Sequence, residues 1–273
     1  MTRDRFAAAG RPGRRAAGLA LAMASALACL LGARAARAGY VPGQGDAPTL
    51  TDSTAPTGRF RSPQNWAVQV TFGPYRPDVD SEFSGRHPYA DYFTNDRHLL
   101  TQAELDYQVF HKMGTAAVGL GLGYFSVSGP SPLASNPAIA SGDKSTLTVV
   151  PVSLSAVYRF DYYLEHDGFP IVPHAKLGLD WAYWQVTDGN GEIARAAGGR
   201  ARGGTLGWHA ALGVALVLDF LDPVAARDFD VEMGVNHTAL VFEVGHADIS
   251  GLGRSNRLHV GDTTWTLGLL FEF

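Results

Sequence analysis

The chain of 273 residues has very little cysteine, and its single Cys29 stands inside an apolar run near the amino terminus. Leu30 and Leu31 continue that run past the cysteine, and Ala26 occupies the place where a lipoprotein signal has leucine. This pattern excludes a lipid-anchored cysteine. Without the amino-terminal segment the chain has no thiol, which excludes disulfides and cysteine-bound metals.

Long apolar runs are also scarce. The longest, Ala16 to Gly32, is alanine-rich and shorter than the roughly 20 strongly apolar residues of a membrane-spanning helix. It follows five arginines within Met1 to Arg15 and precedes the small-residue pattern Ala36-Arg37-Ala38. A positive start, an apolar middle and an A-x-A end are the three parts of a secretory signal peptide. We therefore expect residues 1–38 to be a signal peptide, cleaved after Ala38.

Basic residues are few once this segment is removed. Residues 1–38 hold seven of the 22 Lys and Arg residues but one of the 26 acids, so 15 basic and 25 acidic residues remain. Proteins that bind nucleic acid need clustered positive charge. We expect no nucleic-acid partner for this chain.

Residues 39–64 are rich in Pro, Gly, Ser and Thr, which predicts a flexible linker. From residue 65 to the end, apolar residues alternate with polar or small ones, as they do in strands with two different faces. About eight such segments are present, and ten are possible. They are Trp66–Phe72, Leu105–Val109, Val118–Tyr124, Val152–Phe160, Leu177–Tyr183, Trp208–Leu218, Val231–Val235 and Trp265–Phe273.

The connections between these segments alternate in length. The short ones are 111–114 and 162–170, and the long ones are 74–96, 128–144, 187–204 and 245–261. Residues 220–229 fit this alternation less well, and Pro223-Val-Ala-Ala predicts one helical turn on the inner side. Short inner turns and long outer loops are typical of outer-membrane barrels. The sequence therefore predicts an all-β fold over residues 65–273, an antiparallel up-and-down transmembrane β-barrel in contact with outer-membrane lipid.

Alternation alone also fits a soluble barrel with an apolar interior. Here, however, the non-apolar face is mostly Gly, Ser, Ala and Thr, as a crowded lumen requires, and aromatic residues recur near the strand ends, where headgroups would lie. The last segment also places an aromatic residue at the chain end, which resembles the signal that barrel-insertion machinery reads. The expected signal residues are Trp265, Leu267, Leu269, Phe271 and Phe273.

Several stretches resemble a family of outer-membrane β-barrel proteins known chiefly from myxobacteria. They are Phe72-Gly-Pro-Tyr-Arg-Pro-Asp-Val-Asp-Ser-Glu-Phe83, Glu104-Leu-Asp-Tyr-Gln108, Gly119-Leu-Gly-Leu-Gly-Tyr-Phe125, Pro151-Val-Ser-Leu-Ser-Ala-Val-Tyr-Arg-Phe-Asp161 and Gly234-Val-Asn-His237. The resemblance spans most of residues 65–273. It implies a fold and a location, but the family has no assigned reaction, so it implies no activity.

The polar face of the predicted strands collects many ionisable residues. A barrel of about eight strands has an interior just wide enough for side chains to fill, and buried charges there must pair. These residues therefore predict a lumenal salt-bridge network, with a narrow ion path or a proton relay as the functional alternative. They are Glu104, Asp106, Arg159, Asp161, His174, Lys176, Asp180, His209, Asp219, Glu232 and Glu272.

Three further patterns resemble ligand sites. The carboxylates of Asp78–Glu82 are of a kind that calcium favours, but their spacing does not fit an EF-hand, and a solvated acidic loop explains them better. The glycines of Gly119–Gly123 do not have the spacing of a dinucleotide site, and no helix follows them. The arginines of Arg195–Arg202 could contact lipopolysaccharide phosphates or only solvent. We expect no cofactor and no metal.

Asn236-His237-Thr238 is where an enzyme could be found, with Glu232 or Glu243 to orient the histidine. However, adjacent residues of a strand face opposite sides, so His237 and Thr238 are poorly placed to act together. We expect no enzymatic activity. The leading hypothesis is a barrel with a structural or surface-interaction role through its outer loops. The alternatives are a narrow pore or small-solute-binding barrel and, after it, a lipid-modifying enzyme.

Overall fold

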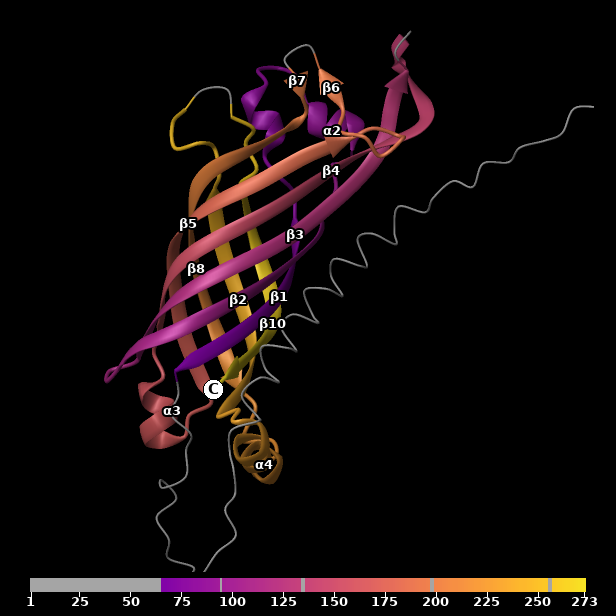
Figure 1. The fold of residues 1–273 in the computed structure, drawn as a ribbon. Coiled ribbons are helices and arrows are strands. Elements are labelled where there is room, and N and C mark those ends of the chain that lie inside the picture. Colours follow the sequence, from indigo (N-terminus) through magenta and orange to yellow (C-terminus); the bar gives the residue numbers. More distant parts are fainter. Residues whose placement is uncertain (1–64, 94, 134–135, 197–198, 255–256) are drawn as a thin grey trace, which may run out of the picture. The chain divides into compact units, whose positions relative to one another are not determined.

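The computed structural model describes residues 65–93, 95–133, 136–196, 199–254 and 257–273. The predicted signal peptide and linker, residues 1–64, lie outside the described residues. The chain divides into two units, Met1–Arg59 and Phe60–Phe273, and every described residue belongs to the second. In that unit eight antiparallel strands form a closed barrel, which confirms the predicted fold class (Figure 1).

Each strand pairs with its neighbours in sequence, and the last strand pairs with the first. A separate two-stranded hairpin, β6 (Arg195–Ala196) with β7 (Gly199–Arg200), lies in the connection between β5 and β8. The barrel strands are β1 (Trp66–Tyr75), β2 (His98–His111), β3 (Thr115–Leu133), β4 (Asn136–Arg159), β5 (Ile171–Thr187), β8 (Arg202–Val217), β9 (His237–Asp248) and β10 (Asp262–Glu272).

Strands β1 and β10 close the barrel in an antiparallel register that places Val70 opposite Leu269. Phe273 extends this seam: its N–H donates to the Trp66 carbonyl at 2.7 Å, and its own carbonyl accepts from the N–H groups of Asn65 and Trp66 at 2.8 and 3.1 Å. Because each of the eight barrel strands pairs with two neighbours, the barrel wall is closed. Beyond the wall, β3 after Phe125 and β4 before Thr146 pair only with each other.

The two faces of the barrel wall differ in chemistry as the alternation predicts. Large apolar side chains project outward and are exposed, with Leu212 at 70% and Leu120 at 59% of full exposure. Inward positions are small or polar: Gln69, Thr71 and Ser155 are all buried. The apolar face is therefore on the outside and the polar face lines the lumen.

The connections separate into two ends of the barrel (Figure 1). We call inner the end that carries the turn 112–114, α3 (Tyr162–Asp167) and α4 (Pro223–Met233). We call outer the end that carries η2 (Val79–Glu82), α2 (Pro88–Tyr92) and the β6–β7 hairpin. Among the described residues, no helix is long and apolar enough to cross a membrane.

One predicted strand is wrong. Val231–Val235 does not form a strand, because residues up to Met233 belong to helix α4. The Asp222 carboxylate caps this helix by accepting from the N–H groups of Val224 and Ala225 at 3.1 and 3.0 Å, and proline occupies its first turn. Gly234 ends it with a left-handed φ of 70°. The seventh barrel strand is β9, which begins at His237.

The predicted loop 128–144 is also wrong, because β3 continues to Leu133 and β4 already begins at Asn136. Small and polar residues gave this stretch a loop-like composition. Pairs of hydroxyl groups link the two strands where apolar contacts are scarce. Ser128 Oγ lies 2.7 Å from Thr146 Oγ1, and Ser131 Oγ lies 2.7 Å from Ser145 Oγ. Such cross-strand pairs stabilise a hairpin even without an apolar face.

Candidate functional site

The lumen is filled in three layers. Apolar side chains fill both ends, and ionisable side chains fill the middle, which we call the polar chamber. The outer apolar cluster is Tyr75, Val79, Tyr89, Leu100, Phe125, Val127, Leu147, Val149, Ala182, Ile249 and Val260. The inner apolar layer is Ala67, Val172, Ala215, Val217, Ala239, Val241 and Leu270.

Lys176 is the centre of the polar chamber. Its Nζ lies 2.5 Å from Glu104 Oε2 and 2.9 Å from Glu243 Oε1, and it donates to Gln69 Oε1 at 3.2 Å. His174 Nε2 lies 2.8 Å from the same Glu243 oxygen. Strands β1, β2, β5 and β9 thus meet across the lumen through one ammonium group. Such a network is stable because each buried charge has partners of opposite sign.

Arg159 and Asp106 form a second ion pair nearer the inner end. Both side chains are almost completely buried, at 3% and 0% of full exposure. Glu272 lies beside this pair and accepts from Gln108 Nε2 at 3.4 Å. Together with Arg159 it lines a small space at the inner end of the lumen. Because both side chains are almost completely buried, their attraction is far less screened than that of a surface ion pair.

A third cluster joins β4, β5 and β8. His209 Nδ1 lies 2.9 Å from Asp180 Oδ2, and His209 Nε2 lies 3.2 Å from Ser155 Oγ. The imidazole therefore contacts a carboxylate through one nitrogen and a hydroxyl through the other. Serine and aspartate are buried, and the histidine side chain is 17% exposed toward the chamber.

Glycines at inward positions make room for these long side chains. A Cβ added at Gly178 would stand 2.5 Å from His209 Cε1, and one at Gly213 would stand 2.6 Å from His174 Nε2. At Gly119 it would meet carboxylate oxygens of the acids on β2 at about the same distance. The chamber is thus built from pairs of a large polar residue and a facing glycine. This register explains why the polar face is rich in glycine.

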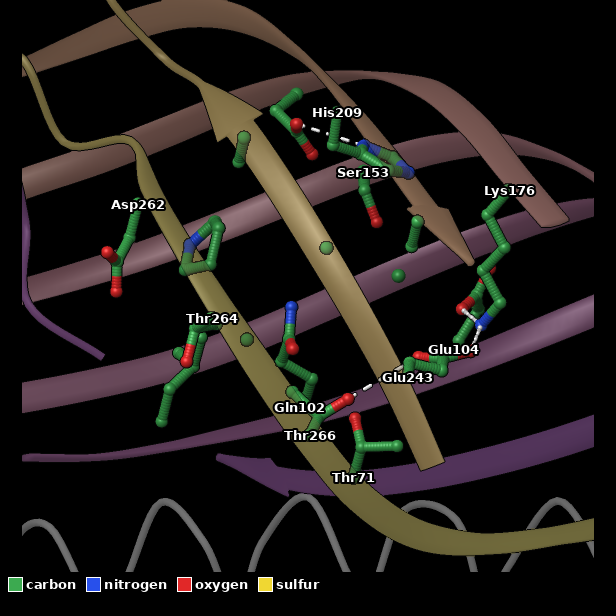
Figure 2. Close-up of a pocket in the computed structure, with 18 of the residues that line it drawn as sticks. Thr71, Gln102, Glu104, Ser153, Lys176, His209, Glu243, Asp262, Thr264 and Thr266 are labelled. Atoms are coloured by element: carbon green, nitrogen blue, oxygen red, sulfur yellow. Dashed lines mark hydrogen bonds and ion pairs between the residues drawn. The ribbon is translucent and has the colours of Figure 1, made fainter. Parts of the chain in front are cut away.

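A cavity of about 140 Å³ remains in the chamber, with walls from all eight barrel strands (Figure 2). At the inner end the lumen narrows to a space of about 10 Å³ beside Arg159. Near the outer end a groove of about 540 Å³ lies between loop residues and the outer ends of β9 and β10, and Ile249 and Asp262 line both it and the chamber. The chamber is therefore closed toward the inner end and adjoins the outer groove.

The structure brings most of the predicted polar residues into the lumen, namely Glu104, Asp106, Arg159, His174, Lys176, Asp180, His209 and Glu272. Asp161 and Asp219 lie at the inner rim, where Asp161 accepts from Thr115 Oγ1 at 2.5 Å and Asp219 contacts His237 Nδ1 at 2.5 Å. Glu232 was wrongly placed in the lumen, because it lies exposed on helix α4.

Glu243, Gln69 and His237 belong to the lumen but were not among the predicted network residues. Glu243 and His237 were missed because the strand before β10 was expected six residues too early. The signal for β9 was present, since Leu240, Phe242 and Val244 alternate around Glu243 and are exposed outward. His237 is buried, bound to Asp219, whereas Thr238 next to it faces the other way. The two side chains thus face opposite sides of the strand, as their adjacency predicts.

The acidic loop 78–82 has a structural role, because it holds helix α2 in place. The Asp80 carboxylate accepts from Arg76 Nη2 at 2.9 Å and from the N–H groups of Tyr89 and Ala90 at 2.7 and 3.3 Å, which fixes α2 to β1. Tyr89 then fills the outer apolar cluster, and burial is the main cause that raises its pKa to about 12. Within the described part of the chain, no group of three His, Cys, Asp or Glu is placed to hold a metal ion.

No protein-family model matches the chain. No curated protein matches it either. Among solved structures, it is similar to Ail, the attachment invasion locus protein of Yersinia pestis, in complex with the heparin analogue sucrose octasulfate. Identity is 8% over 77% of this chain and 97% of that one, with a TM-score of 0.37.

Neisserial surface protein A is similar at 10% identity, over 77% of this chain and 97% of that one, with a TM-score of 0.39. The Yersinia pestis outer membrane protein Ail in a phospholipid bilayer nanodisc is similar at 12% identity, over 77% and 99%, with a TM-score of 0.28. These likenesses are weak, and the description of the barrel here rests on its own strand pairing.

Proposed function

We propose that this chain is an outer-membrane barrel that conducts no ions and acts through the loops at its outer end. The outward face of the barrel wall supports a location in the membrane. Apolar side chains such as Leu177 and Leu212, at 61% and 70% exposure, surround the barrel wall. Soluble proteins rarely expose contiguous apolar patches of more than a few hundred Å², whereas lipid favours them and requires a wall without free backbone groups.

The filled lumen is the observation that carries the proposed role. The inner end leaves a space of about 10 Å³, which is at the limit of what one water molecule needs. The Arg159–Asp106 pair and the inner apolar layer occupy the rest of that end. The outer apolar cluster covers most of the other end. A hydrated ion therefore has no continuous polar path, which favours a role for the outer loops over ion conduction.

Conductance measurements test this proposal. We expect the protein, refolded and added to a planar lipid bilayer, to give no stepwise current above that of the bare bilayer. A general porin reconstituted in the same way is the positive control. Discrete current steps from the wild-type barrel would contradict the proposal and support the narrow-pore alternative.

The outer end presents a cationic hairpin that fits a surface-interaction role. Arg195 and Arg200 lie directly opposite each other in the β6–β7 pair, and Arg202 follows at the start of β8. All three are exposed. Like charges opposite each other in a strand pair are unfavourable, and an anionic group such as a phosphate would remove the repulsion by pairing with both guanidinium groups.

The proposal includes recognition of the last strand by the barrel-insertion machinery. Trp265, Leu267 and Leu269 are 41–49% exposed on the outward face. We expect Phe273→Ala to reduce the amount of inserted barrel several-fold but to leave its melting temperature almost unchanged, because the backbone hydrogen bonds of residue 273 to β1 remain. Heat-modifiable gel mobility of membrane fractions measures both quantities. Normal insertion with a lowered melting temperature would show that the ring is only an anchor.

A further inference from the structure

We infer that Ser155, His209 and Asp180 form a nucleophilic site in the polar chamber, one that accepts a small acyl group from an activated ester. This inference goes beyond the proposed role of the outer loops and does not depend on it. It rests on the order of contacts: the Asp180 carboxylate to His209 Nδ1 at 2.9 Å, and His209 Nε2 to Ser155 Oγ at 3.2 Å. A nucleophile, a base and a group that orients the base are the three parts of hydrolytic serine sites.

The strand register produces this arrangement from three residues far apart in sequence. Gly178 pairs with Ser155 on one side and with His209 on the other, so the three share one row across β4, β5 and β8. Because Gly178 has no side chain, the imidazole lies over it and reaches the hydroxyl of Ser155. Asp180, two residues further along β5, faces the same way and is within reach of the other ring nitrogen. Replacing this glycine with any larger residue would separate base and nucleophile.

The roles follow from the donors and acceptors. Asp180 accepts from the N–H at Nδ1 of His209, which leaves Nε2 free to accept the proton of Ser155 Oγ. Asp180 is then a positioning residue, because it fixes the tautomer and the ring. His209 also faces the chamber, as does Ser153 beside it (Figure 2). Serine, histidine and aspartate all line the cavity of about 140 Å³, which has room for a small molecule and not for a lipid chain.

The reaction balances without a cofactor. Ser155 Oγ bonds to the acyl carbon of an ester, its proton passes to His209 Nε2, and the ester C–O bond breaks as the alcohol leaves with that proton. Water then bonds to the acyl carbon and gives a proton to His209 Nε2. The bond between that carbon and Ser155 Oγ breaks, His209 returns the proton to Oγ, and the carboxylic acid leaves. The strands hydrogen-bond their backbone N–H groups to one another, and Lys176 is already held by Glu104 and Glu243. Stabilisation of the oxyanion is therefore weak. We expect the acyl-serine to form but to be hydrolysed slowly, so that turnover is not rapid.

The test uses methanesulfonyl fluoride on the full-length mature barrel in lipid, followed by mass spectrometry of the protein and its peptides. Ser155 Oγ would bond to sulfur as fluoride leaves. We expect one adduct per chain, located on Ser155 and absent from Ser155→Ala. His209→Gln should slow labelling by about a hundredfold. The matched control is Ser128→Ala, which removes a hydroxyl that contacts Thr146 and no histidine, and it should be labelled at the wild-type rate.

Asp180→Asn tests the positioning role. We expect the maximal labelling rate to fall while the reagent concentration for half-maximal rate stays the same, and heat-modifiable mobility should show an unchanged folded fraction. The inference is overturned if the wild-type barrel is not labelled, if the adduct lies on Ser153, or if His209→Gln is labelled as fast as the wild type. None of these results would alter the conductance test of the proposed function.

Discussion

Arg159→Met should destabilise the barrel by about 3–5 kcal/mol, because it leaves the Asp106 carboxylate buried without its cationic partner. The carboxylate is completely buried, and Glu104 and Glu272 add further negative charge nearby. Gly119 faces the acids and offers no side chain that could take the place of the guanidinium. Urea-induced unfolding of the barrel in lipid vesicles, followed by tryptophan fluorescence, measures the loss.

The control for this variant replaces both partners. Asp106→Leu combined with Arg159→Met removes both charges and keeps the volume of the layer approximately constant. Replacing a buried ion pair by packed apolar residues is often neutral or stabilising, so we expect the double variant to recover most of the loss. If Arg159→Met alone unfolds at the wild-type urea concentration, the pair does not support the inner end of the lumen.

Leu120→Arg and Val214→Arg should reduce assembly strongly, since both side chains point outward, at 59% and 43% exposure. An arginine on the lipid face near the bilayer midplane costs roughly 2–4 kcal/mol. We expect a large fall in the heat-modifiable, folded fraction in outer-membrane preparations. Equal tolerance of substitutions on the outward and lumen-facing sides would contradict the lipid-facing assignment.

The lumen-side control has to be chosen with the structure. Gly121 and Gly213 face the lumen, and from the alternation alone serine would be expected to be mild there. The structure changes that expectation, because an added Cβ would stand 2.1 Å from Ser153 Oγ at Gly121 and 2.5 Å from the Phe242 carbonyl at Gly213. Gly245 has its nearest neighbour, Ala211 Cβ, at 3.4 Å. Gly245→Ser should therefore assemble almost like the wild type.

The amino-acid pattern alone determined the architecture. Period-two alternation in strands such as 118–124 and 265–273 shows which residues share a face, and the barrel class follows from it and from the turns between strands. Seven of the eight predicted segments lie in barrel strands, and the eighth, 231–235, was predicted in place of β9. Residues were grouped into two faces correctly because alternation depends only on local backbone geometry, and the small residues of the polar face and the aromatic residues near strand ends placed the apolar face outside. Eight of the polar residues predicted from it, Lys176 and Arg159 among them, therefore lie in the lumen.

The errors occurred where local composition and long-range pairing disagree. Residues 231–235 alternate for five positions, but the Asp222 cap and Gly234 hold most of them in a helix, and the strand starts after it. Residues 128–133 look like a loop, yet pairing with β4 holds them extended. Because 231–235 was predicted as a strand, Glu232 was placed in the lumen and Glu243, which lies on the real strand β9, was left out of it. A short window contains neither the cap nor the partner strand.

The contacts within the lumen were decided only by the tertiary structure. Alternation predicts that Ser155, Asp180 and His209 all face inward, but not that they meet. Their meeting depends on the register of β4 and β5 with β8, which places Gly178 between serine and histidine. Register is set by pairing along whole strands and by the closure of the barrel, and a shift of two residues would preserve every face while separating all three side chains.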